Sequence, residues 1–198
     1  MKIILASNSP RRKELLGALE MDFEVRILDG IDETYPQGLT MTGIPEHISS
    51  KKASAYALAD EELLIAADTI VYLDGQVLGK PANAGEACAM LRKLSGKTHH
   101  VITGVTLRTV DRTHTFSCVT EVTFANLTEE QIKHYVDTYA PLDKAGAYGI
   151  QEWIGYVGVT SINGSYYNVM GLPVQRLNQE LNAFINNEHN PYIDNLIY

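Results

Sequence analysis

Cysteine is almost absent from this chain. Only Cys88 and Cys118 occur among its 198 residues, and they form no C-x-x-C pair. Two isolated cysteines provide neither a disulfide framework nor a set of zinc ligands. Because the sequence also shows no secretory signal, we expect both cysteines to be reduced core residues of a cytoplasmic protein.

Long apolar runs and an excess of basic residues are missing as well. No hydrophobic stretch approaches the roughly 20 residues of a transmembrane helix. The chain has 24 acidic and 16 basic residues, which gives a net charge of −8, and its six histidines show no metal-ligand spacing. This charge balance disfavours nucleic acid or an anionic membrane as a partner. A site for an anion would therefore need cations that are gathered locally.

Strand and helix patterns alternate along the chain and predict a mixed α/β fold with a long, partly antiparallel sheet. Strands are expected over residues 3–5, 23–27, 63–73, 76–78, 100–108 and 115–124, with a last hairpin formed by 156–162 and 165–170. Helices are expected from Pro10, over 45–60, after capping boxes at Asn83 and Thr128, and over 174–185. Residues 186–198 are expected to form a polar C-terminal tail.

The first predicted strand runs directly into a helix start that carries two arginines. Ser9 stands where an N-cap belongs, and Pro10 suits the first helical turn because its missing N–H would be unpaired there. Free N–H groups at a helix N-terminus favour an anion. Arg11 and Arg12 oppose the helix dipole, so a bound polyanion would explain them. The alternative is that both are solvated residues of an amphipathic helix.

One carboxylate stands inside an apolar strand. Asp68 follows the run Leu63–Ala67 and is followed by Thr69, Ile70 and Val71. A buried carboxylate without a partner is costly, so Asp68 should contact a cation, a metal or hydrogen-bond donors. The apolar flanks favour a functional carboxylate over the alternative, an aspartate bonded to a nearby turn.

Three further segments place polar side chains beside turn residues. Lys80 stands between a glycine and a proline, which indicates a positioned side chain, although an ordinary turn lysine also fits. Residues 143–151 combine charged and small residues, which allow the backbone either to approach a ligand or to pack tightly against the sheet. Asp32 and Glu33 form an acidic pair in a loop, which by itself is weak evidence for a metal.

The order of these segments is more specific than any one of them. The segments are Leu5–Arg12, Asp32–Glu33, Lys52–Ala53, Ala67–Val71, Gly79–Pro81, His100–Val105, Asp143–Gln151 and Gly164–Pro173. Taken together, over residues 3 to 177, they resemble the Maf family of nucleoside triphosphate pyrophosphatases. The resemblance implies one domain over 1–185, with an elongated mixed sheet flanked by helices and a cleft between two lobes.

The resemblance also implies an activity and its residues. It implies hydrolysis of a nucleoside triphosphate between the α and β phosphorus atoms, with Mg²⁺ or Mn²⁺ as cofactor, in a homodimer. Asp68 would accept the proton of the attacking water, and Glu33 and Asp68 would lie at the metal. The residues that would bind phosphate are Ser7, Arg12, Lys52, Lys80 and Lys144.

Three positions connect the chain with the branch of the family that cleaves dTTP and UTP. That branch has arginine, threonine and glutamine where this chain has Arg11, Thr69 and Gln151. Two departures are Glu152, where glycine is common, and Asn163, where many members have an acid. The alternatives are a pyrophosphatase for 7-methyl-GTP or another modified nucleotide, modified pyrimidines included, and a nucleotide-binding regulator of cell division.

Overall fold

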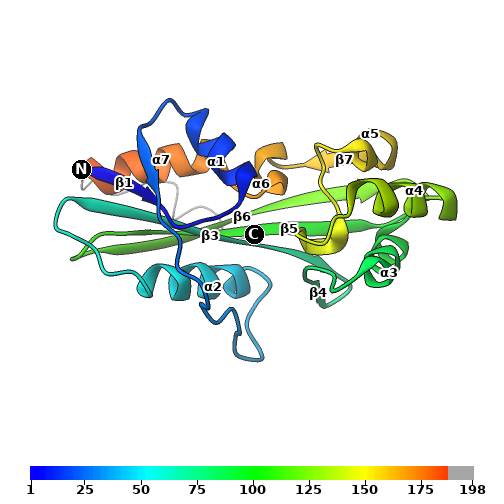
Figure 1. The fold of residues 1–198 in the computed structure, drawn as a ribbon, viewed down its shortest axis with the longest axis horizontal. Coiled ribbons are helices and arrows are strands. Elements are labelled where there is room, and N and C mark those ends of the chain that lie inside the picture. The colour runs from blue at the N-terminus through cyan, green and yellow to red at the C-terminus, as the bar shows by residue number, and fades with distance from the viewer. Residues whose placement is uncertain (187–198) are drawn as a thin grey trace.

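A seven-stranded mixed sheet runs along the molecule in the computed structural model, which describes residues 1–186 (Figure 1). The strand order is β2-β1-β3-β5-β6-β7, with the short β4 paired to the end of β3. Only β1 pairs in parallel, with β2 and with β3; the other pairs are antiparallel. The strands are β1 (Lys2–Leu5), β2 (Phe23–Val25), β3 (Glu62–Leu73), β4 (Gln76–Leu78), β5 (Thr98–Arg108), β6 (Thr113–Phe124) and β7 (Val159–Asn163).

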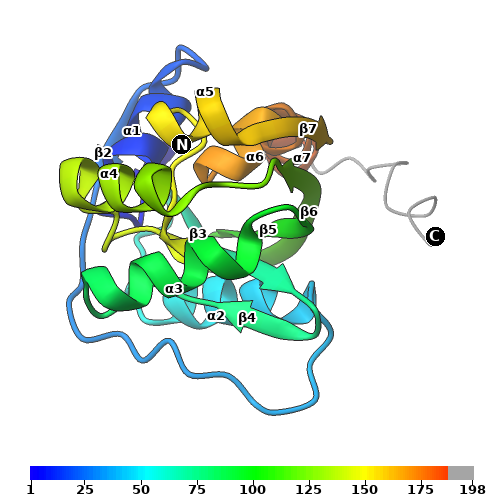
Figure 2. The same ribbon diagram turned by 90° about the vertical axis from the view of Figure 1, so that its right-hand side faces the viewer.

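Helices cover both faces of the sheet and one of its ends. In Figure 1, α2 (Gly43–Ser54) lies below the long strands, and α1 (Pro10–Gly17), α6 (Tyr166–Met170) and α7 (Val174–Asn186) lie above them. Figure 2 looks onto the covered end of the sheet, on the right of Figure 1, where α3 (Ala84–Leu94), α4 (Glu129–Tyr139) and α5 (Trp153–Gly158) lie. A short 3-10 turn, η1 (Ala145–Ala147), leads towards α5. The predicted mixed α/β fold with a flanked sheet is confirmed.

The hydrophobic core is divided along the length of the sheet. One large cluster packs α3, α4 and the 145–154 segment against the sheet, with Leu91 and Tyr135 fully buried. A second large cluster packs α1 and α7 against β1, β3 and β5, with Leu16 and Leu177 fully buried. Two smaller clusters lie between α2 and the opposite face of the sheet. Asp68 lies in the middle of β3, opposite Gly104 of β5. The polar centre of the molecule therefore lies along β3 and β5, which the two large core clusters share.

Close packing between α2 and the sheet depends on a glycine of β5. A Cβ atom at Gly104 would overlap the backbone of Pro45 and Glu46 in α2. No side chain can turn away from such a contact, because the obstacle is backbone. Gly104 therefore sets how closely α2, which carries Lys52, approaches the middle of β3.

The last predicted hairpin is wrong. Of the first predicted strand only residues 159–162 are extended, as part of β7, while 156–158 belong to α5; the second predicted strand is replaced by α6. The Ser165 hydroxyl caps α6 by accepting the Asn168 N–H at 3.3 Å, and the buried Asn168 amide donates to Val101 O at 3.0 Å and Cys118 O at 3.2 Å. These tertiary hydrogen bonds hold the segment as a helix on the sheet, which local alternation did not reveal.

Two other boundaries also differ from the predictions. The helix predicted over 45–60 is α2, which begins two residues earlier and ends at Ser54, so Ala55 and Ala59 are exposed outside it. β2 ends at Val25, and Ile27 is 45% exposed. At α3, Asn83 accepts the Glu86 N–H, but the Glu86 carboxylate accepts from Ala82 N, so only half of that capping box forms. The capping box of Thr128 is confirmed.

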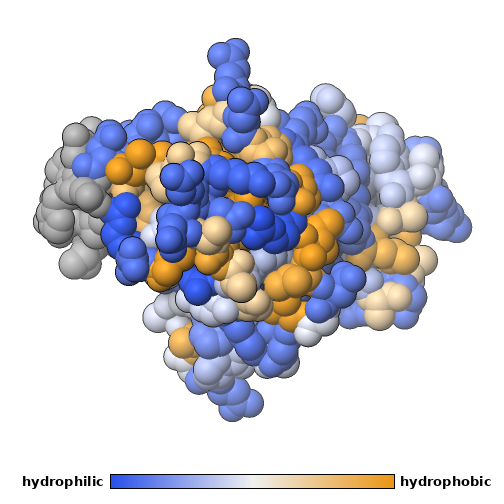
Figure 3. Space-filling view, turned by 60° about the vertical axis from the view of Figure 1, so that its left-hand side comes forward, coloured by the Kyte–Doolittle hydropathy of each residue, from blue (hydrophilic) through white to orange (hydrophobic). Residues whose placement is uncertain are grey.

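Within residues 1–186, no helix has both the length and the apolar character needed to cross a membrane. Figure 3 shows hydrophobic side chains in small patches among hydrophilic ones on the face that it presents. Apart from Asn186, which ends α7, the predicted tail 186–198 lies outside the described residues.

Replacing Gly104 with alanine should destabilise the fold. We expect Gly104→Ala to lower the free energy of unfolding by about 1–3 kcal/mol in urea titrations, because α2 must move away from the sheet. Gly79→Ala is the control, since a Cβ atom there has no neighbour within 4 Å. That control should change stability by less than about 0.5 kcal/mol. Equal effects of the two substitutions would contradict the close-packing argument.

Candidate active site

Two adjoining cavities form one cleft and share Ser9, Arg11, Arg12, Lys52, Lys80 and Asp143 in their walls. The first, which we call the Gln151 cavity, is also lined by Thr69, Tyr148 and Gln151. The second, the Glu33 cavity, is also lined by Ser7 and Glu33 and has a volume of about 620 Å³. All ten residues to which the family resemblance assigns a catalytic, metal-binding, phosphate-binding or specificity role line one cavity or the other, whereas Asp32 lines neither. The fold thus brings together residues spread over 145 positions of the chain, from 7 to 151.

Asp68 is held by a lysine of α2. Lys52 Nζ lies 2.7 Å from Asp68 Oδ1 and 2.9 Å from Glu33 Oε1. The side chains of Lys52 and Asp68 are only 14% and 13% exposed, whereas that of Glu33 is 50% exposed. Partial burial would raise the pKa of Glu33, but Lys52 and the charges of Lys80 and Arg12 outweigh it, so that pKa lies below its ordinary value. The apolar flanks of Asp68 predicted a partner, and the structure identifies it as Lys52.

Arg12 is fixed by three oxygen atoms from different parts of the chain. Its guanidinium donates to Gly171 O at 2.8 Å, Thr69 Oγ1 at 3.1 Å and Ser7 Oγ at 3.3 Å. Burial lowers the pKa of Arg12, and the charge of Asp68 partly offsets this effect. An arginine remains protonated under such conditions, so it is a preorganised cation in the cleft.

The start of α1 forms as predicted. Ser9 caps the helix by accepting the backbone N–H of Arg12 at 3.4 Å, and Pro10 lies in the first turn. Both Arg11 and Arg12 line the cleft, so the alternative of two solvated arginines is wrong.

Thr69 supports Arg12 and β5 as well as lining the cleft. Its hydroxyl contacts Arg12 and also lies 2.9 Å from Thr103 Oγ1, which donates to Asn168 O at 3.1 Å. This chain of hydrogen bonds connects α1, β3, β5 and α6. A change at Thr69 would therefore also disturb the position of Arg12.

The 143–152 segment carries a second group of charges. Asp143 accepts from Arg11 at 3.0 Å and from Lys144 at 2.7 Å. Lys144 Nζ also lies 3.2 Å from Glu152 Oε1. Partial burial alone would raise the pKa of Asp143. Lys144 and Arg11 outweigh this effect, so the pKa lies below its ordinary value. Asp143 therefore holds two cations of the cleft side by side.

Tyr135 anchors this segment from α4 and was missed in the sequence. Its hydroxyl donates to Glu152 Oε2 and accepts the Gly149 N–H at 3.0 Å. Burial is the main cause of the raised pKa of Tyr135, and the hydrogen bond to Glu152 adds to it. In the sequence Tyr135 is one apolar position of an amphipathic helix, so no local signal distinguishes it from a core residue.

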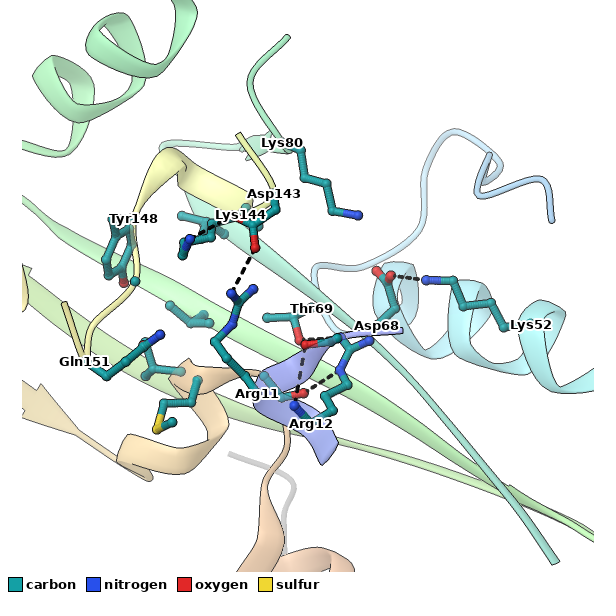
Figure 4. Close-up of a pocket in the computed structure, with 18 residues that line it drawn as sticks. Arg11, Arg12, Lys52, Asp68, Thr69, Lys80, Asp143, Lys144, Tyr148 and Gln151 are labelled. Atoms are coloured by element: carbon teal, nitrogen blue, oxygen red, sulfur yellow. Dashed lines mark hydrogen bonds and ion pairs between the residues drawn. The ribbon is translucent and has the colours of Figure 1, made fainter. Parts of the chain in front are cut away.

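Gln151 presents a polar atom that lacks a protein partner. Its Oε1 is buried and accepts no hydrogen bond, although the residue lines the cleft. In Figure 4, Gln151 and the Asp68–Lys52 pair lie on opposite sides of Arg11 and Arg12. The backbone before it is strained at Ala147, a residue with a side chain and a φ of 59°. Ordered strain of this kind is typical of ligand-binding segments.

Lys80 reaches both cavities from the end of β4. The carbonyl of Gly79 accepts the Gly146 N–H at 3.0 Å, which connects the strand end to η1. That backbone bond explains why the lysine stands in a turn of defined shape. The Lys80 side chain itself is exposed, and its assignment as a positioned side chain stays a prediction.

Cations outnumber carboxylates in the cleft, although the chain as a whole has a net charge of −8. The cations of the lining are Arg11, Arg12, Lys52, Lys80 and Lys144, and the carboxylates are Asp29, Glu33, Asp68 and Asp143. Across residues 1–186, no three or more His, Cys, Asp and Glu side chains gather in a way that could hold a metal ion. The cleft is therefore suited to an anion, and a metal ion bound there would need ligand atoms from that anion as well as from the protein.

The comparisons with known proteins agree over almost the whole chain. The family model of Maf-like proteins matches residues 2–184. A dTTP/UTP pyrophosphatase of Phocaeicola vulgatus is 62% identical over 91% of this chain and 94% of its own length. That of Parabacteroides distasonis is 58% identical over 92% and 96%. The chain therefore belongs to the Maf family.

Among solved structures, a HAM1 protein from Coxiella burnetii is similar with a TM-score of 0.49 and 16% identity, covering 92% of this chain and 98% of its own. That likeness is too distant to bear on the chemistry of the cleft.

Removing Lys144 should raise the pKa of Asp143. Lys144→Met takes away one of the two cations that stabilise the Asp143 carboxylate, so partial burial has more effect and protonation occurs at higher pH. The change can be measured by ¹³C NMR titration of the carboxyl carbon. In the control Lys133→Met, which breaks the separate contact with Asp137, the Asp143 titration should not change. An unchanged or lowered pKa in Lys144→Met would refute this electrostatic account.

Proposed function

We propose that this member of the Maf family hydrolyses dTTP and UTP to the nucleoside monophosphate and pyrophosphate. The observation that carries the proposal is the layout of the cleft. A shielded carboxylate and five cations stand beside a cavity that contains the unpaired amide oxygen of Gln151. Relatives that are 62% and 58% identical are named dTTP/UTP pyrophosphatases, which supports the same substrates here.

The triphosphate would lie against the shared cations. Phosphoryl transfer needs positioned positive charge more than covalent chemistry by the protein. Arg12 is preorganised by its three hydrogen bonds, and Lys80 lines both cavities. Ser7 and the capped start of α1 add neutral donors on the same side. Lys52 and Lys144 complete the phosphate-binding set.

A divalent cation fits the carboxylates of this cleft. Glu33 and Asp68 direct carboxylate oxygen atoms to the same point, where the ammonium group of Lys52 lies in this structure. Mg²⁺ commonly binds through one or two carboxylates together with substrate phosphates, so two protein ligands suffice. Mn²⁺ accepts the same oxygen ligands. When bound, the metal would neutralise charge on the phosphate oxygens.

Asp68 would act as the general base. Its carboxylate takes a proton from a water molecule as the water oxygen bonds to the α-phosphorus. The bond from the α-phosphorus to the bridging oxygen breaks, and pyrophosphate leaves with that electron pair. Arg12 and the lysines stabilise the negative charge that shifts towards pyrophosphate.

Gln151 would read the base. Its amide has both a donor and an acceptor, which matches the alternating carbonyl and N–H groups of uracil and thymine. Val71, Val101, Val169 and Met170 supply apolar contacts in the same cavity. Arg11 is held by Asp143 near these residues, at the boundary between base and phosphates. Thr69 would act through its hydrogen bond to Arg12.

The chain would act in the cytoplasm as a homodimer, without a nucleic-acid or membrane partner. Both cysteines are free thiols, which is compatible with a reducing compartment. The net charge of −8 also disfavours nucleic acid. Sedimentation of the purified protein measures the oligomeric state directly.

Replacing Asp68 should greatly reduce turnover. Wild-type protein should release pyrophosphate from dTTP and UTP with Mg²⁺ or Mn²⁺, and more slowly from CTP, GTP, 7-methyl-GTP and ATP. Asp68→Asn keeps the shape of the side chain but removes the base, so kcat for dTTP should fall by roughly 10²-fold or more. Asp137→Asn, on the exposed side of α4, is the control. Near-normal turnover by Asp68→Asn would rule out the general base, and no release from any nucleotide would favour a binding regulator.

Replacing Gln151 should weaken the selection of the base. Gln151→Ala should reduce the preference for UTP over GTP, because the amide that pairs with the pyrimidine edge is lost. A ratio of kcat/KM values for the two nucleotides reports this without depending on overall activity. A preference as strong as that of the wild type would remove Gln151 from the role of base reader.

A further inference from the structure

Lys52 stands at the point where two candidate metal ligands meet. Its ammonium lies 2.7 Å from Asp68 Oδ1 and 2.9 Å from Glu33 Oε1, so it contacts both carboxylates at once. An ion bound to the same two oxygen atoms would require much of the same space, since Mg²⁺–oxygen distances are about 2.0–2.1 Å. Two cations cannot share that point. Lys52 and a divalent metal therefore compete for Asp68 and Glu33.

The position of Lys52 is set by its helix and by the loop opposite. Lys51 and Lys52 are consecutive residues of α2, and Asp32 and Glu33 are consecutive residues of the loop. Lys51 Nζ contacts Asp32 Oδ2 at 2.6 Å, beside the Lys52–Glu33 pair. Two parallel ion pairs thus dock the loop on α2. Asp32 and Lys51 make the outer pair, and Lys51 lines neither cavity.

We propose that Lys52 blocks the metal site of the nucleotide-free protein and leaves it only when a triphosphate arrives. The proposal rests on the assignment of Glu33 and Asp68 as metal ligands. Released from the two carboxylates, Lys52 needs a new anion, and the phosphate oxygens in the same cleft supply it. Metal and triphosphate binding are then mutually dependent, because each favours the state in which Lys52 has moved. The metal enters together with the nucleotide and is not bound beforehand.

The competition also explains how Lys52 can be both the partner of Asp68 and a phosphate-binding residue. In the free protein Lys52 keeps the Asp68 carboxylate paired in a mostly shielded position. In the complex the metal pairs with that carboxylate and Lys52 contacts phosphate. Neither state leaves the shielded Asp68 carboxylate without a cation, and this avoids the cost of an unpaired buried charge.

Mn²⁺ binding to nucleotide-free protein tests this directly, by electron paramagnetic resonance of free Mn²⁺ during titration. The wild type should bind weakly. Lys52→Met removes the competing charge and should bind Mn²⁺ about tenfold more tightly or better, by analogy with the effect of one neighbouring charge on a carboxyl group. Lys52→Arg keeps a cation between the carboxylates and should resemble the wild type. Lys51→Met loosens the loop without freeing the site and should also resemble the wild type.

Two further variants locate the gain. Adding Glu33→Gln to Lys52→Met should abolish the tighter binding, because one of the two carboxylates is lost. Lys52→Gln provides a second neutral replacement, and circular dichroism checks that each variant is folded. Tight Mn²⁺ binding by the wild type alone, equal affinity of wild type and Lys52→Met, or a gain that survives Glu33→Gln would each overturn the proposal.

The outcome is independent of turnover. If dTTP is not hydrolysed but the Mn²⁺ affinities change as expected, the competition stands and the proposed reaction fails. If dTTP is hydrolysed but Lys52→Met binds Mn²⁺ no better than the wild type, the reaction stands and the competition fails.

Discussion

The ion pair between Asp68 and Lys52 is the interaction on which the site depends. A carboxylate in the middle of an apolar strand needs a partner, because an unpaired buried charge is costly. α2 supplies that partner, and the backbone contact of Gly104 with α2 brings the helix close enough to do so. The same lysine reaches Glu33 and thereby fixes the loop that closes the cleft from the other side.

The rest of the cleft repeats this pairing of opposite charges. Asp143 holds Arg11 and Lys144, and the oxygen atoms of Ser7, Thr69 and Gly171 hold Arg12. Arg11, Arg12 and Lys144 are thus kept in place by partners that a phosphate oxygen can replace or share. An acidic protein can in this way maintain a locally cationic cleft without a basic surface, which separates nucleotide chemistry from binding to nucleic acid.

Much of this arrangement was predictable where the physical cause is local. The apolar flanks of Asp68 predicted a buried charge with a partner, and Ser9 and Thr128 predicted helix starts that the structure confirms. The resemblance to the Maf family, carried by ordered short segments, placed every proposed site residue in one cleft. Their catalytic and binding roles remain predictions, because location alone does not measure a role.

The errors share a cause in tertiary contacts. Residues 156–170 alternate enough to resemble a hairpin, but the buried amide of Asn168 bonds to two backbone carbonyls of the sheet and favours a short helix. Tyr135 resembles any core residue in sequence, and only the fold brings its hydroxyl to Glu152 and Gly149. The partners of both side chains are distant in sequence, so no local pattern could reveal them.

The position of bond cleavage is the central claim, and hydrolysis of dTTP in ¹⁸O-labelled water tests it most directly. If water activated by Asp68 attacks the α-phosphorus, the label appears in dTMP and pyrophosphate stays unlabelled. Label in pyrophosphate would mean attack on the β-phosphorus, and release of orthophosphate would mean cleavage at the γ-phosphorus. Either result would contradict the account.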